Sequence, residues 1–195
     1  MEEKRLQIMQ AAEALFKTRR FHEITTDDVA DRAGVGKGTI YRYFKDKDDL
    51  FYQTASHGLD ELCRLLAAGV DGQDFRSQLN DAARRISEFF ESRRQLFRMI
   101  GAEENRFQTG GGRHGHQWRE RRMQLVRALA AILQRGVAEG HLRPEVPPEV
   151  LAAFLLGMLR TQFRSRDDLP EGFRDHAAVI DLFWEGAGRE REVRK

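Results

Sequence analysis

Residues 33–47, AGVGKGTIYRYFKDK, contain side chains for two different phosphate-binding chemistries. Residues 36–39, GKGT, are similar to the glycine-rich loop of a nucleotide-binding enzyme, in which backbone amides and a lysine hold phosphates. Residues 41–43, YRY, are of the types that contact the phosphates and base edges of DNA. Because each chemistry needs its own local fold, the neighbouring residues decide between them.

The nucleotide-binding loop fails on its spacing. It requires glycine, four residues and then Gly-Lys-Ser/Thr, placed between a buried strand and a helix. Asp31 stands where the first glycine should be, and Gly38 stands where a hydroxyl should bind magnesium. The preceding residues 25–33, TTDDVADRA, are polar and follow a helical pattern instead of a β-branched run. The sequence therefore does not favour a nucleotide-binding enzyme.

The residues before the run predict two helices and a sharp turn. An apolar stripe at the helical period indicates the first helix. It consists of Ile8, Ala11, Ala12, Leu15 and Phe16. Thr25 is expected to cap a second helix by accepting a hydrogen bond from the amide of Asp28. Gly34 follows that helix, where a tight turn favours a left-handed residue.

A third helix is predicted through residues 39–44, with an apolar and a basic, aromatic face. Ile40 and Phe44 share one helical face and are expected to pack inward. The outward face holds Lys37, Thr39, Arg42 and Tyr43. The net charge of the whole chain is only +2, but positive charge is concentrated at residues 36–47. Two helices joined by a glycine turn, the second with an exposed basic face, predict a DNA-binding helix-turn-helix.

Residues 24–51, ITTDDVADRAGVGKGTIYRYFKDKDDLF, resemble the N-terminal signature of the tetracycline-repressor (TetR) family of transcriptional regulators. The shared features are a threonine cap, an apolar-Ala pair, Ala-Gly-Val, Gly-Thr-apolar-Tyr, and a lysine ahead of an apolar residue. One departure is Arg20, because many members have glycine before the aromatic that Phe21 matches. This departure changes how the first helix ends and leaves the recognition residues untouched.

Nine residues are candidates for DNA contacts: Thr25, Thr26, Lys37, Gly38, Thr39, Tyr41, Arg42, Tyr43 and Lys47. The two threonines lie at a helix N-terminus, which can bind a phosphate. Lys37 and Gly38 open the recognition helix, where such helices meet base edges, and Gly38 would let the backbone come close. Thr39 can contact a phosphate or a thymine methyl, and Arg42 is the candidate for a bidentate contact with guanine.

The resemblance implies that Tyr41 and Tyr43 contact phosphates and that Lys47 clamps the DNA backbone from the start of the fourth helix. Two alternatives stay open. The ring of Tyr41 could pack between helices, and Lys37 and Arg42 could be solvated surface charge.

The fold is predicted to be all-α, since no alternating strand pattern occurs, with about nine helices. We expect a helix-turn-helix domain at residues 1–47 and a larger helical domain for ligand binding and dimerisation at residues 48–195. The helix at residues 150–163 is apolar around most of its girth, which indicates burial on more than one side and hence a partner subunit. The resemblance implies that the last two helices pair with their copies in a four-helix bundle. The expected interface residues are Leu155, Leu159, Ile180, Phe183 and Trp184.

A cavity for an apolar or amphipathic small molecule is expected between the middle helices. Its predicted border consists of Ile86, Phe90, Phe97, Trp118, Leu125, Phe154 and Met158. For each of these side chains taken singly, plain core packing is the competing explanation. Filling the cavity is expected to tilt the helix that begins at Lys47, and so to change the separation of two recognition helices.

Composition sets the remaining bounds. Hydrophobic residues make up 41% of the 195 residues, which is enough for a packed core. The longest apolar stretch, residues 150–159, is well short of the ~20 residues that cross a bilayer. The single Cys63 cannot form an internal disulfide, which fits a reducing cytoplasm. His114 and His116 lie in the glycine-rich residues 109–115, where a solvent-exposed loop is favoured over a metal site. We therefore expect a cytoplasmic protein with no cofactor, no metal and no membrane partner.

The predicted function is that of a ligand-responsive transcriptional regulator. The favoured form is a homodimeric repressor that binds a palindromic operator in double-stranded DNA and is released by a small-molecule effector. The alternative is a transcriptional activator, or a regulator controlled by a protein partner. An enzyme that uses the helical pocket is least favoured, because no Ser-His-Asp order or zinc-protease motif is visible.

Overall fold

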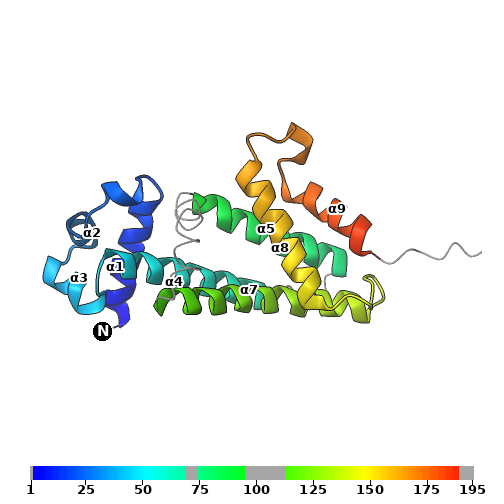
Figure 1. Cartoon of the computed structure of the whole chain (residues 1–195), viewed down its shortest axis with the longest axis horizontal. Coiled ribbons are helices and arrows are strands. Elements are labelled where there is room, and N and C mark those ends of the chain that lie inside the picture. Colours follow the sequence, from blue (N-terminus) through cyan, green and yellow to red (C-terminus); the bar gives the residue numbers. More distant parts are fainter. Residues whose placement is uncertain (1, 69–73, 95–112, 189–195) are drawn as a thin grey trace, which may run out of the picture. The chain divides into compact units, whose positions relative to one another are not determined.

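The computed structural model describes residues 2–68, 74–94 and 113–188. These residues form only helices, turns and connections, together with one isolated bridge between Leu142 and Gly188, so the all-α prediction is confirmed (Figure 1). The α helices are α1 (Glu2–Phe16), α2 (Thr26–Ala33), α3 (Lys37–Tyr43), α4 (Lys47–Ala67), α5 (Phe75–Ser92), α7 (Arg113–Ala138), α8 (Pro148–Ser165) and α9 (His176–Ala187). Two short 3-10 helices, η1 (Phe21–Glu23) and η2 (Glu171–Phe173), complete the described part.

The chain divides into two compact units. Unit 1 consists of Met1–Glu61 and Ser92–Arg121, and unit 2 consists of Leu62–Glu91 and Arg122–Lys195. Helices α4 and α7 each contribute residues to both units. The predicted division at residues 47 and 48 stays a prediction.

In unit 1, α1, α2 and α3 lie together (Figure 1), and their buried side chains form an apolar core. Ile8 and Phe16 from α1, with Ile40 and Phe44 from α3 and its C-terminal cap, are at most 1% exposed. Helices as short as α2 and α3 are marginal alone. Each fully buried large apolar side chain contributes about 1.5–3 kcal/mol, so packing supplies the stability that short helices lack. The predicted inward faces of α1 and α3 are confirmed.

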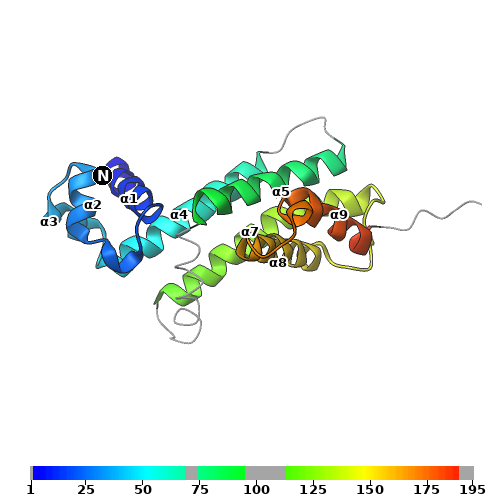
Figure 2. The same cartoon turned by 90° about the horizontal axis from the view of Figure 1, so that it is seen from above.

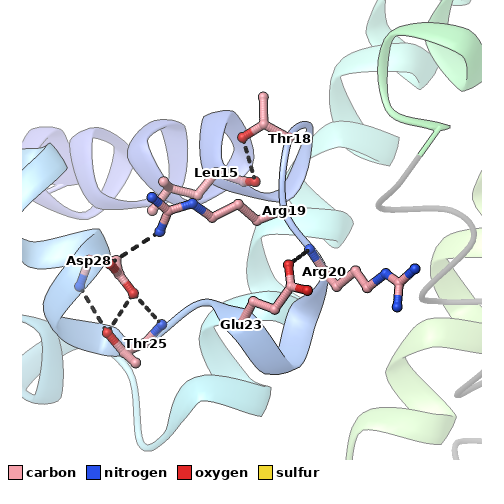
Figure 3. Close-up of polar contacts among 7 residues, drawn as sticks. All are labelled: Leu15, Thr18, Arg19, Arg20, Glu23, Thr25 and Asp28. Carbon is pink, nitrogen blue, oxygen red and sulfur yellow. Dashed lines mark hydrogen bonds and ion pairs between the residues drawn. The ribbon is translucent and has the colours of Figure 1, made fainter.

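Local signals set the ends of α2. The hydroxyl of Thr25 accepts a hydrogen bond from the Asp28 amide at 3.1 Å, as the sequence predicts (Figure 3). Gly34 ends the helix with φ +61°, the left-handed conformation that glycine adopts without strain. The Val35 amide then donates to the Ala30 carbonyl at 3.0 Å, which closes the turn into α3.

In unit 2, α5 is amphipathic and its apolar face is buried. Helix α8 packs against α9 (Figure 2). The predicted start of α8 at the paired prolines is confirmed, since Pro148 occupies its first turn. Gly136 of α7 lies against the ring of Phe75, where a Cβ would come within 2.2 Å of Phe75 Cζ. This close approach explains a glycine inside α7.

The predicted loop at residues 109–115 is wrong for its last three residues, because α7 begins at Arg113. The glycine at position 115 costs this helix of 26 residues about 1 kcal/mol, which the rest of the helix offsets. Residues 109–112 lie outside the described part. Within the described residues, no helix is both long and apolar enough to cross a membrane.

Candidate nucleic-acid interface

The first turn of α2 and the exposed face of α3 together form one polar surface in unit 1. The hydroxyls of Thr26 and Tyr41 are 3.1 Å apart. Next to them, the Lys37 ammonium donates to the Asp27 carboxylate at 2.8 Å. Consecutive residues of α2 thus pair with residues one helical turn apart on α3. Side chains that are distant in sequence are brought onto the face that the sequence assigns to DNA.

Thr25 is occupied by the cap itself (Figure 3). Its hydroxyl donates to Asp28 Oδ2 at 2.6 Å, and its amide donates to the same oxygen at 2.7 Å. These two hydrogen bonds, followed by the nearby Arg19 guanidinium, hold the pKa of Asp28 below its ordinary value. The Thr25 hydroxyl therefore serves α2, and Thr26 is the threonine whose hydroxyl reaches α3.

The exposed face of α3 carries the side chains predicted to contact DNA. Lys37, Gly38 and Arg42 are exposed, and Thr39 and Tyr43 are half-buried. Tyr41 is 50% exposed, so its ring is not enclosed between helices. Because Ile40 lies buried beneath this face, α3 is held against the core while its polar side chains stay accessible.

Arg42 and Tyr43 position each other. The Arg42 guanidinium lies 5.1 Å from the centre of the Tyr43 ring, and its Nη2 donates to the Tyr43 hydroxyl at 3.5 Å. Arg42 is exposed, and its other guanidinium N–H groups can still donate to a planar acceptor. The pair therefore presents donors suited to a guanine edge or a phosphate.

Lys47 is supported by an aromatic residue that the sequence reasoning missed. Its ammonium lies 4.1 Å from the centre of the Phe21 ring, and partial burial lowers the pKa of Lys47. Phe21 in turn lies 5.1 Å from Phe51 and 6.3 Å from Phe16, centre to centre. Lys47 is thus held at the N-terminus of α4, and the signal for this arrangement was the aromatic residue at position 21.

The chain departs from the TetR signature at Arg20, where the backbone conformation does not require glycine. The backbone of Arg20 has φ −74° and ψ 151°, an extended conformation open to any residue. Its amide donates to Glu23 Oε2 at 3.1 Å, which starts η1 (Figure 3). Beside it, Arg19 pairs with Asp28 at 3.3 Å, so the connection after α1 is tied to α2.

Taken together, the surface offers ammonium, guanidinium and hydroxyl donors on a rigid helix, which suits phosphates and base edges. Residues 8–54 match the model of the tetR family of bacterial regulatory proteins. A TetR-family regulator from Mesorhizobium loti has the same fold, with a TM-score of 0.76 at 22% identity, over 96% of this chain and 98% of that one. Residues 8–54 are thus of the tetR family, and over the whole length the chain shares the fold of a TetR-family regulator.

Two relatives of this chain are transcriptional regulators. It is 26% identical to the HTH-type regulator YfiR of Bacillus subtilis, over 80% of this chain and 77% of YfiR. It is 27% identical to the HTH-type repressor Rv1474c of Mycobacterium tuberculosis, over 92% of this chain and 90% of the repressor. The regulator FadR of Bacillus subtilis, solved with stearoyl-CoA, has the same fold, with a TM-score of 0.74 at 17% identity, over 93% of this chain and 98% of FadR. The relatives are regulators of transcription and not enzymes.

The predicted effector pocket stays a prediction. Ile86, Phe90 and Leu125 are buried in unit 2, and Met158 is half-buried there. Phe154 is 65% exposed. Trp118 is buried in unit 1. Phe97 lies outside the described residues. A separate hollow in unit 2 is lined by Leu65, Leu66, Gln78, Asp81, Ala82, Arg85 and Ile132, none of which was predicted.

The predicted subunit interface also stays a prediction, but four of its five residues are buried within their own chain. Leu155, Leu159, Ile180 and Phe183 are at most 4% exposed, and the Trp184 ring lies 6.0 Å from the ring of Phe75. The large apolar side chains exposed on α8 and α9 are Val150, Phe154 and Leu182, at 39%, 65% and 53%. Because α8 is apolar on two faces, its sequence did not tell which one faces outward.

Proposed function

We propose that this TetR-family regulator is a homodimeric repressor that binds a palindromic DNA operator and is released by a small molecule. The observation that carries the proposal is the exposed face of α3. Lys37, Tyr41 and Arg42 stand on it, while Ile40 and Phe44 anchor the helix beneath. A rigid helix with an exposed basic and aromatic face suits the major groove.

The contacts divide into those that read bases and those that hold the backbone. Arg42 is the candidate for base recognition, because its guanidinium stays 5.1 Å from the Tyr43 ring and keeps its outer edge accessible. Lys47, supported by Phe21, is the candidate for a phosphate. Thr26 and Tyr41, with their hydroxyls 3.1 Å apart, can share a neighbouring phosphate.

Substitution of the two cations separates these roles. Arg42→Ala should cost about 1–3 kcal/mol of binding free energy and relax the base preference. Lys47→Ala should weaken binding to all duplexes alike and reduce the salt slope by about one unit. Both follow from fluorescence anisotropy with duplexes selected from a randomised library. Unchanged affinity and base preference in Arg42→Ala would show that α3 does not read the DNA.

Helices α8 and α9 pack against each other, and the apolar side chains that they leave exposed support dimerisation. Water-exposed Phe154 and Leu182 gain by pairing with a second copy, since large apolar side chains are stabilised by burial. Phe154→Arg should shift the chain from dimer to monomer in sedimentation velocity. Met123→Arg, at a 41% exposed position of α7, is the matched control and should leave the dimer intact. A dimeric Phe154→Arg variant would exclude this surface.

Release by an apolar or amphipathic effector is supported by the stearoyl-CoA bound to FadR, a protein of the same fold. In this chain, Ile86, Phe90, Leu125 and Met158 are the candidates for lining the site in unit 2. A tenfold loss of DNA affinity requires about 1.4 kcal/mol of coupling between the two ligands. Linkage then requires operator DNA to weaken effector binding by the same factor. Calorimetric titration of stearoyl-CoA, with and without the selected duplex, measures that factor, and equal affinities would exclude stearoyl-CoA as a releasing effector.

A promoter fusion distinguishes a repressor from an activator. Placing the selected duplex across a constitutive promoter should lower reporter expression when the chain is present. Arg42→Ala should restore expression, because it removes the proposed base contact. Increased expression with the wild-type chain would favour the activator.

A further inference from the structure

Asp27 places a negative charge on the face proposed for DNA. It lies in the first turn of α2, and its carboxylate is 2.8 Å from the ammonium of Lys37, the first residue of α3. Both side chains are more than half exposed, at 57% and 56%. The pair lies directly beside the Thr26–Tyr41 hydroxyl contact, so it belongs to the same surface.

The cap of α2 does not require Asp27. Asp28 makes both reciprocal hydrogen bonds with Thr25, and Arg19 pairs with Asp28. A second acid in the first turn is favoured by the helix dipole, but this explains only its charge. Its contact with Lys37 joins α2 to the first residue of α3 and engages the Lys37 ammonium.

A DNA phosphate that approaches Asp27 and Lys37 would interact with both charges. It would be repelled by the carboxylate, and it would compete with that carboxylate for the ammonium. An oxygen of Asp27 holds the place on Lys37 that a phosphate or base oxygen would take in a complex.

We propose that the Asp27 carboxylate competes with DNA for Lys37. It holds the Lys37 ammonium in the free protein, and DNA must displace it before Lys37 can contact a phosphate or base. The inference rests on the proposed DNA-binding function. The repulsion of phosphates by Asp27 and its competition for Lys37 act on every duplex, including the nonspecific sites that outnumber an operator. Asp27 thereby weakens nonspecific binding, which depends on phosphate contacts.

The test compares Asp27→Asn with Asp31→Asn, which removes the same charge from an exposed position of the same helix. A random-sequence duplex is titrated by fluorescence anisotropy over a series of salt concentrations. Asp27→Asn should tighten binding about three- to tenfold, since it removes both an ion pair and a repulsion. The salt slope should steepen by about one unit, because Lys37 becomes available to a phosphate. Asp31→Asn should change both quantities much less.

A double-mutant cycle then assigns the effect to Lys37. In a Lys37→Ala background, most of the gain from Asp27→Asn should disappear. Equal gains from Asp27→Asn and Asp31→Asn, or a full gain in the absence of Lys37, would overturn the inference and leave the proposed function standing. Salt-independent or absent binding by the wild-type chain and all variants would overturn both. Urea unfolding of each variant establishes that the compared proteins are folded.

Discussion

Gly38 should show opposite effects on stability and on DNA binding when it is replaced by alanine. It lies in the first turn of α3, is exposed, and a Cβ at this position meets no atom within 4 Å. Its φ is not in the left-handed region, so alanine fits the backbone without strain. Glycine costs up to about 1 kcal/mol relative to alanine within a helix, and less near an end. Gly38→Ala should therefore stabilise the chain by about 0.5 kcal/mol.

The same methyl group should oppose DNA binding. If the start of α3 approaches base edges, Gly38 allows its backbone to come closer than any residue with a Cβ. A methyl that prevents this approach should weaken binding about tenfold, which corresponds to about 1.4 kcal/mol. Urea unfolding measures the gain in stability, and fluorescence anisotropy with a selected duplex measures the loss in affinity.

Gly34→Ala is the matched control, because its Cβ also meets no atom within 4 Å. Here φ is +61°, so alanine adopts a left-handed conformation that costs about 1–2 kcal/mol. Lower entropy of the unfolded chain offsets about 0.4–1 kcal/mol, which leaves a net destabilisation of about 1 kcal/mol. A Gly38→Ala variant that binds DNA as tightly as the wild type would refute the placement of Gly38 against DNA. Destabilisation of Gly38→Ala as large as that of Gly34→Ala would refute the assignment of a relaxed helical backbone.

Two further substitutions test packing and electrostatics. Gly136→Ala should destabilise the chain by about 1–3 kcal/mol in urea unfolding, because its Cβ would lie 2.2 Å from Phe75 Cζ, and a Phe75→Leu background should recover part of the loss. Asp28→Asn should flatten the acid side of the stability profile: the folded pKa of Asp28 lies below its ordinary value of 3.8, so its ionised form stabilises the fold above that pH and the contribution is lost as pH falls through the folded pKa. Unfolding midpoints below about pH 4 measure this difference, and parallel profiles for wild type and variant would contradict the assigned cap.

The sequence predicted those parts of the fold that depend on near neighbours. Thr25 caps α2 through a residue three positions away, and Gly34 ends it with its own backbone. Such signals act within one helical turn, so the sequence alone contains them. The paired prolines before α8 are a third case.

Contacts between helices were not predicted. The Asp27–Lys37 pair and the seating of Lys47 on Phe21 depend on how α2, η1, α3 and α4 cross. The period of a helix shows which residues share a face, but it does not identify the residues on the opposing helix. The same limit explains α8, where adjacent Phe154 and Leu155 are both apolar, yet one is 65% exposed and the other is buried.

The measurement that tests the central claim most directly is the salt dependence of DNA binding. The claim is that the face of α3 and the adjoining start of α4 bind duplex DNA. Arg42, Lys45 and Lys47 are the cations in question, and Lys37 joins them when DNA displaces Asp27. For a duplex selected from a randomised library, the logarithm of the binding constant should fall linearly with the logarithm of salt concentration. Four cationic contacts in each subunit, eight in the dimer, give a slope of about −7. A slope near zero, or a library from which no sequence is enriched, would contradict the account.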